Sequence, residues 1–312
     1  MSFNVIGIGE VLWDLLPSGP QLGGAPANFA YHAQALGANA QITTRVGRDL
    51  NGAEIIRRLS AMGLPTGGVQ LDDSAPTGTV TVSLTAGIPE YNIHRNVAWD
   101  HIVADVDALT AVSRADAICF GSLAQRSPVS RESIKRLVSA TPERCLRVFD
   151  INLRQQFYCL ETIEQSLLLA DLLKMNDQEL PVLAEMFQLP KTTEAQIVSL
   201  ADRFELATVV LTRGGDGSLI YHRGMWSDQA SASVKVMDTV GAGDAFAAAV
   251  VIGLLFGQAL GAVHAFATEV AGYVCTCAGA TPSLPESMRN HFRKLSLASQ
   301  PPAHSQAPLR AG

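Results

Sequence analysis

Basic clusters and an excess of positive charge are missing from this chain of 312 residues. Asp and Glu number 29 against 23 for Lys and Arg, so the net charge at neutral pH is −6. Nucleic acids and anionic membranes attract basic surfaces, and this balance argues against both as partners. We therefore expect the ligands of this protein to be small molecules.

Long apolar runs are also missing. Every apolar stretch is interrupted before it could cross a bilayer, and the N-terminus lacks the basic and apolar segments of a signal peptide. The five cysteines are scattered and odd in number, which is typical of free thiols in a reducing compartment. Cys275 and Cys277 point to different faces of an expected helix, so they do not form a metal site. We expect a soluble, cytoplasmic protein.

Three nucleotide-binding signatures are absent. An expected strand at residues 5–9 contains two glycines, but no third glycine and no helix follow at the spacing that a dinucleotide site requires. The chain contains no Gly-x-x-x-x-Gly-Lys-Ser/Thr run and none of the loops of protein kinases. These observations exclude an NAD-dependent enzyme, a P-loop kinase and a protein kinase.

The middle of the chain alternates between expected helices and strands. Helices are expected at residues 105–112 and 128–139, and strands at residues 116–120 and 147–151. Such alternation predicts a parallel sheet with helices on both faces. The length fits one large α/β domain with a small appendage.

A β-rich segment interrupts this pattern between residues 69 and 99, where no helix fits the sequence. We therefore predict a three-layer, doubly wound α/β fold with a mostly parallel sheet and a small additional β-sheet. The domain is expected to cover residues 1–296. Residues 297–312 are rich in Ser, Pro, Gln and Ala and are expected to be a disordered tail.

The run Asp-Thr-Val-Gly-Ala-Gly-Asp at residues 238–244 leads into an Ala- and Val-rich segment that predicts a helix. Gly241 and Gly243 let the backbone pass close to a ligand while the first amides of the helix point outward unpaired, a geometry suited to phosphate. In this first turn the helix dipole keeps the Asp244 carboxylate ionised, so it can accept a proton from an attacking hydroxyl. The alternative is an ordinary glycine-rich turn capped by an acid.

Three polar side chains elsewhere are suited to binding a sugar or a phosphoryl group. Asp14 follows the first strand, where its carboxylate can accept hydrogen bonds from sugar hydroxyls or be a solvated loop acid. Asn28 lies in an otherwise apolar helix start, where its amide can discriminate hydroxyls or simply face solvent. Arg154 follows the strand at residues 147–151, and its planar guanidinium suits phosphoryl oxygens or a surface salt bridge.

Two later segments follow buried strands. Residues 212–218 contain three glycines whose amides can approach the phosphates of a nucleotide, although a hairpin turn explains the glycines nearly as well. Asp177 and Glu179 fit the N-cap and the first-turn acid of a helix. Residues 193–196 fit a capping box, which is purely structural.

Residues 238–246 resemble the C-terminal signature of the ribokinase-like (PfkB) family of carbohydrate kinases, and Gly-Gly-Ala-Pro-Ala-Asn at residues 23–28 resembles the N-terminal signature of its fructokinases. The resemblance extends from residue 5 to about residue 285. It implies that Asp244 is the catalytic base. It also implies an anion hole made of the amides of Gly241, Ala242 and Gly243.

Other family features bear on the substrate. Ribokinases and 1-phosphofructokinases usually carry a lysine where this chain has Ala25, which argues against a phosphorylated sugar as substrate. The strings Asp-x-Asn-x-Arg at residues 150–154 and Asn-x-x-Glu at residues 176–179 are similar to further family motifs. They imply that Arg154 binds phosphoryl oxygens and that Glu179 acts on Mg²⁺ through water.

The resemblance also implies a β-sheet lid over the sugar, made of about residues 10–22 and 75–101. In many relatives part of the lid crosses to a second subunit, so we expect a homodimer. Tyr91, Arg95 and Trp99 are candidates for sugar contact from the lid, the alternative being ordinary residues of an exposed β flap. The expected sugar-binding residues are Asp14, Gly23, Gly24, Asn28, Tyr91 and Arg95.

A nucleotide site beside the anion hole is implied as well. Its expected residues are Asn176, Thr212, Gly214, Gly215, Gly217 and Gly279. Asp238 and Ser283 are expected to border a monovalent cation such as K⁺. The expected cofactors are therefore ATP and Mg²⁺, with K⁺ as the candidate monovalent ion.

These motifs together predict an ATP-dependent kinase for a small unphosphorylated sugar, most similar to fructokinases. The alternatives within the class are a kinase of 2-keto-3-deoxygluconate or of another sugar or nucleoside. From a different class, the alternative is a non-catalytic sugar-binding regulator on the same fold. The intact Asp244 and the glycines before it argue against that regulator.

Overall fold

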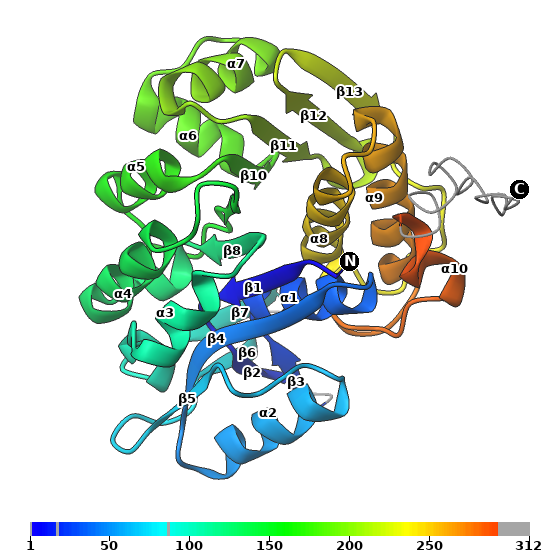
Figure 1. The fold of residues 1–312 in the computed structure, drawn as a ribbon. Helices are drawn as coiled ribbons and strands as arrows, with labels where there is room; N and C mark the ends of the chain where they lie inside the picture. The colour runs from blue at the N-terminus through cyan, green and yellow to red at the C-terminus, as the bar shows by residue number, and fades with distance from the viewer. Residues whose placement is uncertain (1, 17–18, 86–87, 293–312) are drawn as a thin grey trace, which may run out of the picture.

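A nine-stranded sheet runs through the molecule (Figure 1). The computed structural model describes residues 2–16, 19–85 and 88–292. All strand pairs from β5 to β11 are parallel, and the pairs of β12 with β11 and β13 are antiparallel, which confirms the predicted mostly parallel sheet. In spatial order the strands are β13 (Met225–Gln229), β12 (Ser218–His222), β11 (Thr208–Thr212), β10 (Leu172–Asn176), β9 (Leu146–Asp150), β8 (Ala117–Gly121), β1 (Asn4–Ile8), β4 (Asn39–Gly47) and β5 (Val69–Asp72).

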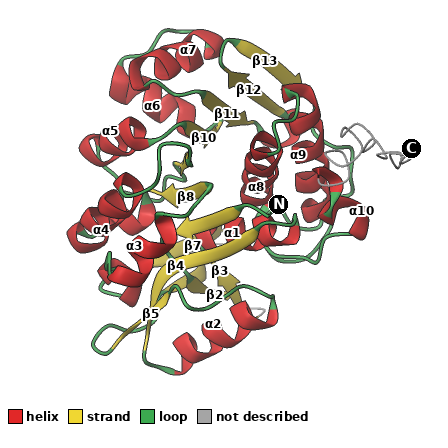
Figure 2. Ribbon diagram, in the orientation of Figure 1, coloured by secondary structure: helices red, strands yellow, loops and turns green. Residues whose placement is uncertain are grey.

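Helices cover both faces of this sheet (Figure 2), so its central strands are apolar on both sides. One face packs against α1, α8 and α9, and the other packs against α3 to α7. The sequence therefore reads as buried strands without alternation, as in β8, where all five residues are buried. The helices are α1 (Ala25–Ala35), α2 (Leu50–Ala61), α3 (Val106–Val112), α4 (Pro128–Ser139), α5 (Leu160–Leu169), α6 (Glu179–Phe187), α7 (Thr193–Phe204), α8 (Ala242–Leu255), α9 (Leu260–Cys275) and α10 (Glu286–Arg289).

Helix α8 is apolar on every side because it lies between α1, α9 and the sheet. Residues 245–253 of this helix are all buried. Its N-terminal turn is only half-buried, so the polar chemistry of this helix is confined to its first residues.

A separate four-stranded sheet confirms the predicted small β-sheet. In this lid sheet β2 and β6 are parallel, while β3 and β7 pair antiparallel with them at the two edges. Its strands are β3 (Gly19–Gly23), β2 (Leu12–Leu16), β6 (Thr79–Thr85) and β7 (Ile88–Ile93).

The segment after β7 does not belong to the lid sheet. Ala98–His101 forms a short 3-10 helix, and the Trp99 side chain within it is 1% exposed. The guanidinium of Arg126 lies 3.9 Å from the centre of the Trp99 ring. The expectation that Trp99 contacts the sugar is therefore wrong, because its indole is part of the core shared with α3 and α4.

Other differences from the sequence analysis are small. Thr192 and not Thr193 is the N-cap of α7, and it accepts a hydrogen bond from the amide of Ala195. The capping box expected at residues 193–196 is therefore wrong, because Ala195 at the third helical position has no side chain that could bond back to the N-cap amide. The tail expected at residues 297–312 lies outside the described residues. None of the described helices is long and apolar enough to cross a membrane.

Candidate active site

The N-terminus of α8 is an open turn that requires glycine. Gly241 is the N-cap residue and has a φ of 78°, a left-handed conformation that favours glycine. A Cβ atom at this position would also collide with the carbonyl oxygen of Ala280. Within the described residues, the amides of Gly243 and Asp244 have no hydrogen-bond acceptor. The turn therefore offers two backbone donors to an anion.

Asp244 lies in this first turn and is held by a residue of α1. Asn28 Nδ2 donates a hydrogen bond of 2.8 Å to Asp244 Oδ2. Burial, and then the nearby Asp150 carboxylate, raise the pKa of Asp244 to about 7. Lys174, Asn28 and Arg154 oppose this rise. The expectation that the helix dipole keeps Asp244 ionised is therefore wrong at neutral pH, because burial outweighs the dipole. A carboxyl group that is about half ionised can still take a proton from a hydroxyl and release it again.

A buried ion pair lies beside the same turn. Lys174 of β10 places its Nζ 2.8 and 2.9 Å from the two carboxylate oxygens of Asp150, the last residue of β9. A Cβ atom at Gly243 would lie 3.2 Å from this Nζ, so the ammonium contacts the first turn of α8. Sequence reasoning missed this pair. The available signal was a lysine within an apolar strand, since lysine is almost never fully buried unless it is paired.

Asp14 lies in β2 of the lid sheet rather than in the loop expected beyond the first strand. Its Oδ2 occupies the space that a Cβ atom of Gly23 on β3 would take. Gly24 follows with a φ of 119° as the N-cap of α1, and a Cβ atom there would collide with the carbonyl oxygen of Glu10. Gly23 thus lets β3 pass close to the Asp14 carboxylate, and Gly24 lets the start of α1 pass close to the backbone of Glu10.

The positive charge of Arg154 acts on both Asp14 and Asp244. Burial raises the pKa of Asp14, and Arg154 opposes this rise, as it does for the pKa of Asp244. The Arg154 side chain itself is exposed and donates to the carbonyl of the adjacent Leu153. The structure therefore brings Asp14, Asn28, Arg154 and Asp244 to one region.

Arg95, which the sequence places in the lid and which follows β7 in the structure, reaches the loop that carries Arg154. Its guanidinium carbon lies 4.9 Å from the centre of the Phe157 ring. Arg95 and Phe157 line an open cavity of about 430 Å³ together with Gln155 and Gln156. The side chain of Tyr91 lies outside the described part of the structure, although its backbone belongs to β7.

Asn176 and Glu179 bind each other's backbone at the start of α6. Asn176 Oδ1 accepts hydrogen bonds of 2.9 Å from the amides of Gln178 and Glu179. In return, Glu179 Oε2 accepts from the Asn176 amide, and Oε1 accepts from the Leu153 amide, both at 2.8 Å. Glu179 is thus the expected acid in the first turn of α6. We expect Asp177 to cap this helix from the sequence, but the side-chain oxygen that accepts from its first amides belongs to Asn176.

The carboxylates of this region do not form a resident metal cage. No group of three or more His, Cys, Asp or Glu residues suited to a metal ion occurs in the described ranges. Both oxygens of Glu179 already accept backbone amides, and burial raises the pKa of this carboxyl group. Mg²⁺ keeps several waters and is bound through few carboxylates when phosphates supply the rest. Direct coordination by Glu179 is therefore disfavoured, and its action on Mg²⁺ through water stays a prediction.

The glycine-rich residues 212–218 connect two antiparallel strands, as the hairpin alternative predicts. Gly214–Asp216 forms a 3-10 turn, and Gly217 follows with a φ of 92°. Ser231 Oγ donates to the carbonyl of Gly215, and Thr212 Oγ1 donates to the carbonyl of Met175. A nucleotide role for this hairpin stays a prediction.

Asp238 joins the segment before α8 to the segment after α9. Its Oδ2 accepts a hydrogen bond of 3.0 Å from the Gly279 amide, and its Oδ1 accepts one of 3.0 Å from the Val240 amide. The contact between Ala280 and Gly241 places this junction beside the anion-binding turn. Ser283 is instead engaged through its carbonyl, which accepts a hydrogen bond of 3.0 Å from the Tyr273 hydroxyl.

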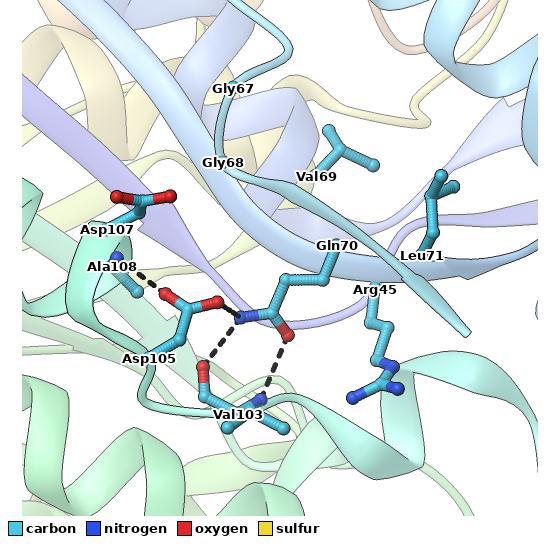
Figure 3. Close-up of a pocket in the computed structure, with 10 residues that line it drawn as sticks. All are labelled: Arg45, Gly67, Gly68, Val69, Gln70, Leu71, Val103, Asp105, Asp107 and Ala108. Atoms are coloured by element: carbon cyan, nitrogen blue, oxygen red, sulfur yellow. Dashed lines mark hydrogen bonds between the residues drawn. The ribbon is translucent and has the colours of Figure 1, made fainter. Parts of the chain in front are cut away.

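Another cavity of about 430 Å³ lies beside β5 and the start of α3 (Figure 3). The Gln70 amide spans it by bonding both the carbonyl and the amide of Val103, and Asp105 caps α3 through the Ala108 amide. None of the predicted site residues lines this cavity. We therefore treat it as separate from the candidate active site.

A helix N-terminus that offers amides to an anion, next to a carboxyl group that can take a proton, is suited to phosphoryl transfer. Residues 20–287 match the profile of the pfkB family carbohydrate kinases. The protein therefore belongs to the pfkB family and is an ATP-dependent carbohydrate kinase.

Individual relatives agree with this assignment. The chain is 30% identical to the fructokinase of Escherichia coli over 266 residues, which cover 81% of this chain and 85% of that protein. The structure of an uncharacterized sugar kinase from Pyrococcus horikoshii in complex with ATP is 27% identical, with a TM-score of 0.76 over 93% of this chain and 97% of that chain. The fold is also that of the fructokinase from Vibrio cholerae O395 solved with fructose, ADP and a calcium ion, which is 24% identical with a TM-score of 0.78 over 94% and 99% of the two chains.

Proposed function

We propose that this kinase transfers the γ-phosphoryl group of ATP to a hydroxyl of a small unphosphorylated sugar, with fructose as the preferred acceptor. The observation that carries this proposal is the hydrogen bond between Asn28 and Asp244, which joins the sugar-side helix to the base. Ala25, the first residue of α1, supplies no cation to balance a sugar phosphate. The similarity to the E. coli fructokinase supports the choice of sugar.

In the proposed reaction, Asp244 accepts the proton of the sugar hydroxyl while the hydroxyl oxygen forms a bond to the γ-phosphorus. The bond between this phosphorus and the bridging oxygen breaks, and ADP leaves with the electron pair. Because Asn28 occupies Oδ2 of Asp244, we assign proton transfer to Oδ1. The unpaired amides of Gly243 and Asp244 and the Arg154 guanidinium stabilise charge on the phosphoryl oxygens. The Ala242 amide, expected in the same role, donates instead to the Thr239 carbonyl. Asp14 and Asn28 orient the sugar hydroxyls.

The nucleotide is proposed to lie along the carboxyl ends of β10 and β11 and against Gly279. Asn176 and Glu179 are the residues that would hold Mg²⁺ through water, and this ion would neutralise phosphate charge. Asp238, which already bonds the Gly279 amide, is the proposed border of a monovalent-cation site together with Ser283. Thr212, Gly214, Gly215 and Gly217 are the proposed contacts from the β11–β12 hairpin.

We also propose that the lid sheet closes over the sugar and joins two subunits into a homodimer. Its edge strands β3 and β7 each have one unpaired side within the described residues, and such edges invite pairing. The domain proposal of residues 1–296, with the lid as a discontinuous part of it, follows from this role. A cytoplasmic location is proposed because the thiols of the sequence suit a reducing compartment.

A second candidate acceptor is 2-keto-3-deoxygluconate, a sugar acid. The favouring observation is that Arg95 and Arg154 are both exposed near the same loop, and neither forms an ion pair in the described part of the chain. Two such guanidinium groups could bind a substrate carboxylate.

A coupled ADP-release screen distinguishes these functions. Fructose, 2-keto-3-deoxygluconate, ribose, nucleosides, fructose 1-phosphate and fructose 6-phosphate are compared by kcat/KM, with Asp244→Asn as the inactive control. We expect fructose to give the highest value. A higher value for the sugar acid would favour the second acceptor, and ADP release with none of the compounds would support a non-catalytic sugar-binding protein.

A further inference from the structure

Lys174 and Asp150 are direct cross-strand partners in the register of β10 and β9. They are 7% and 4% exposed, respectively, and their side chains pair through two hydrogen bonds. The ammonium lies next to Gly243, on the face of the sheet that carries α8. A buried charge in this position acts more strongly on the turn above it than a surface charge would, because less water screens it.

The groups around this pair are mostly acidic. Asp244 faces it from α8, Glu179 faces it from α6, and Glu10 follows β1. The Cys119 thiol on β8 lies among the same charges, and Asn28 and Arg154 face Asp244 from α1 and from the loop after β9. Lys174 is the buried cation of this set. Burial alone would lower the pKa of its ammonium, but the carboxylates outweigh burial and hold this pKa above its ordinary value.

We propose that Lys174 is a positioning residue for phosphoryl transfer, whose ammonium, fixed by Asp150, places a positive charge directly under the anion-binding turn of α8 that carries Asp244. This inference rests on the proposed role of Asp244 as the base. Glycine at position 243 contributes to this arrangement, because a Cβ atom there would lie only 3.2 Å from Lys174 Nζ. Asp150 has two opposing effects: it fixes Lys174, and its own charge disfavours ionised Asp244.

The two members of the pair are therefore expected to act on Asp244 in opposite directions. Lys174→Met removes the charge that favours ionised Asp244 and should raise the pKa of Asp244. Asp150→Asn removes a neighbouring negative charge and should lower it. A neighbouring charge typically shifts a carboxyl pKa by about one unit or more, so the pKa of Asp244 should differ by about two units between the two variants. A merely structural pair would not produce shifts of opposite sign.

The direct measurement is a ¹³C NMR titration of the full chain labelled at aspartate carboxyl carbons, with Asp244→Asn used to assign the resonance. The second measurement is the acid limb of the pH profile of kcat/KM for the sugar. Arg45→Met is the matched control, because it removes the cation from a separate ion pair with Asp72. This control should leave the titration of Asp244 unchanged.

Lys174→Met leaves the Asp150 carboxylate buried without its partner, so the double variant Lys174→Met/Asp150→Asn is included to keep the site neutral. It should titrate between the two single variants. Unchanged titration of Asp244 in Asp150→Asn, or shifts of the same sign in both single variants, would overturn the proposal. The NMR titration does not depend on turnover. If none of the tested sugars caused ADP release, but the two single variants shifted the pKa of Asp244 in opposite directions, the proposed function would be contradicted and the charge coupling would stand.

Discussion

Asn28 Nδ2 lies 2.8 Å from Asp244 Oδ2, so two residues 216 positions apart share one hydrogen bond at the site. From the sequence we expect Asn28 to bind sugar hydroxyls and Asp244 to accept the proton. The contact shows that the amide also holds the carboxyl group in place. Asn28 is 5% exposed, which leaves little freedom for either side chain to turn away.

Asn28→Ala should therefore affect the base as well as sugar binding. The change removes a hydrogen bond that lowers the pKa of Asp244, so this pKa should rise and the acid limb of kcat/KM should move to higher pH. Sugar KM should rise far more than ATP KM, because a lost hydrogen bond in a buried site costs about 1 to 3 kcal/mol. Steady-state kinetics across pH measure both effects. Gln34→Ala, later in the same helix, is the control, and an unmoved acid limb in Asn28→Ala would contradict the assigned role.

The titration of Asp244 should also make the stability of the protein depend on pH. Its folded-state pKa is raised to about 7 from an ordinary value of 3.8. Between these pH values the unfolded chain has released the proton while the folded protein retains it, so this group removes stability as the pH rises through the window. Asp244→Asn does not titrate and escapes that loss. Calorimetry should show a Tm difference between Asp244→Asn and wild type that is near zero at pH 4 and favours the variant at pH 8. A pH-independent difference would show that the pKa is not raised.

The parts of this site that the sequence predicted are local. The glycine at position 241 and the acid at position 244 follow from the chemistry of one helix N-terminus, and their structure depends on few distant residues. Lys174 was missed because its partner is 24 residues away, and their pairing depends on the register of β9 and β10. A single sequence does not specify that register.

Long-range packing also explains the wrong and incomplete assignments. Trp99 follows the lid strands in sequence, but its ring is covered by Arg126, which comes from a different part of the chain. Asp14 was expected at the end of a main-sheet strand and lies within the lid sheet, because the chain turns into β2 after only a few residues. In both cases the surroundings of the residue depended on the tertiary structure, which the local sequence does not specify.

If two subunits associate through the lid sheet, a charged residue introduced on the exposed surface of that sheet should weaken the dimer. Leu15 on β2 is 38% exposed, so Leu15→Glu should weaken a dimer formed through the lid sheet. Sedimentation velocity at micromolar concentration should show a dimer for wild type and a shift toward monomer for the variant. Leu168→Glu, on the exposed side of α5, is the matched control and should remain dimeric. Monomeric wild type under these conditions would contradict the lid interface.

The mechanism is tested most directly at Asp244 and Gly243. Asp244→Asn keeps the size of the side chain but cannot accept the hydroxyl proton, so kcat should fall by about 10² to 10⁴. ATP binding should persist, because the backbone donors of the turn are unchanged. Gly243→Val should weaken ATP binding as well, since its Cβ atom would lie 3.2 Å from Lys174 Nζ and its branches would crowd the phosphate position.

Sugar phosphorylation rates, a calorimetric ATP titration and a melting curve for each variant separate these effects. The ATP titration distinguishes loss of the base from loss of the anion-binding turn, and the melting curve detects a damaged fold. Retention of more than about a tenth of wild-type kcat by Asp244→Asn is less loss than removal of a general base brings. In that case Asp244 would not be the base, and phosphoryl transfer in this protein would have to proceed with proton acceptance by another group.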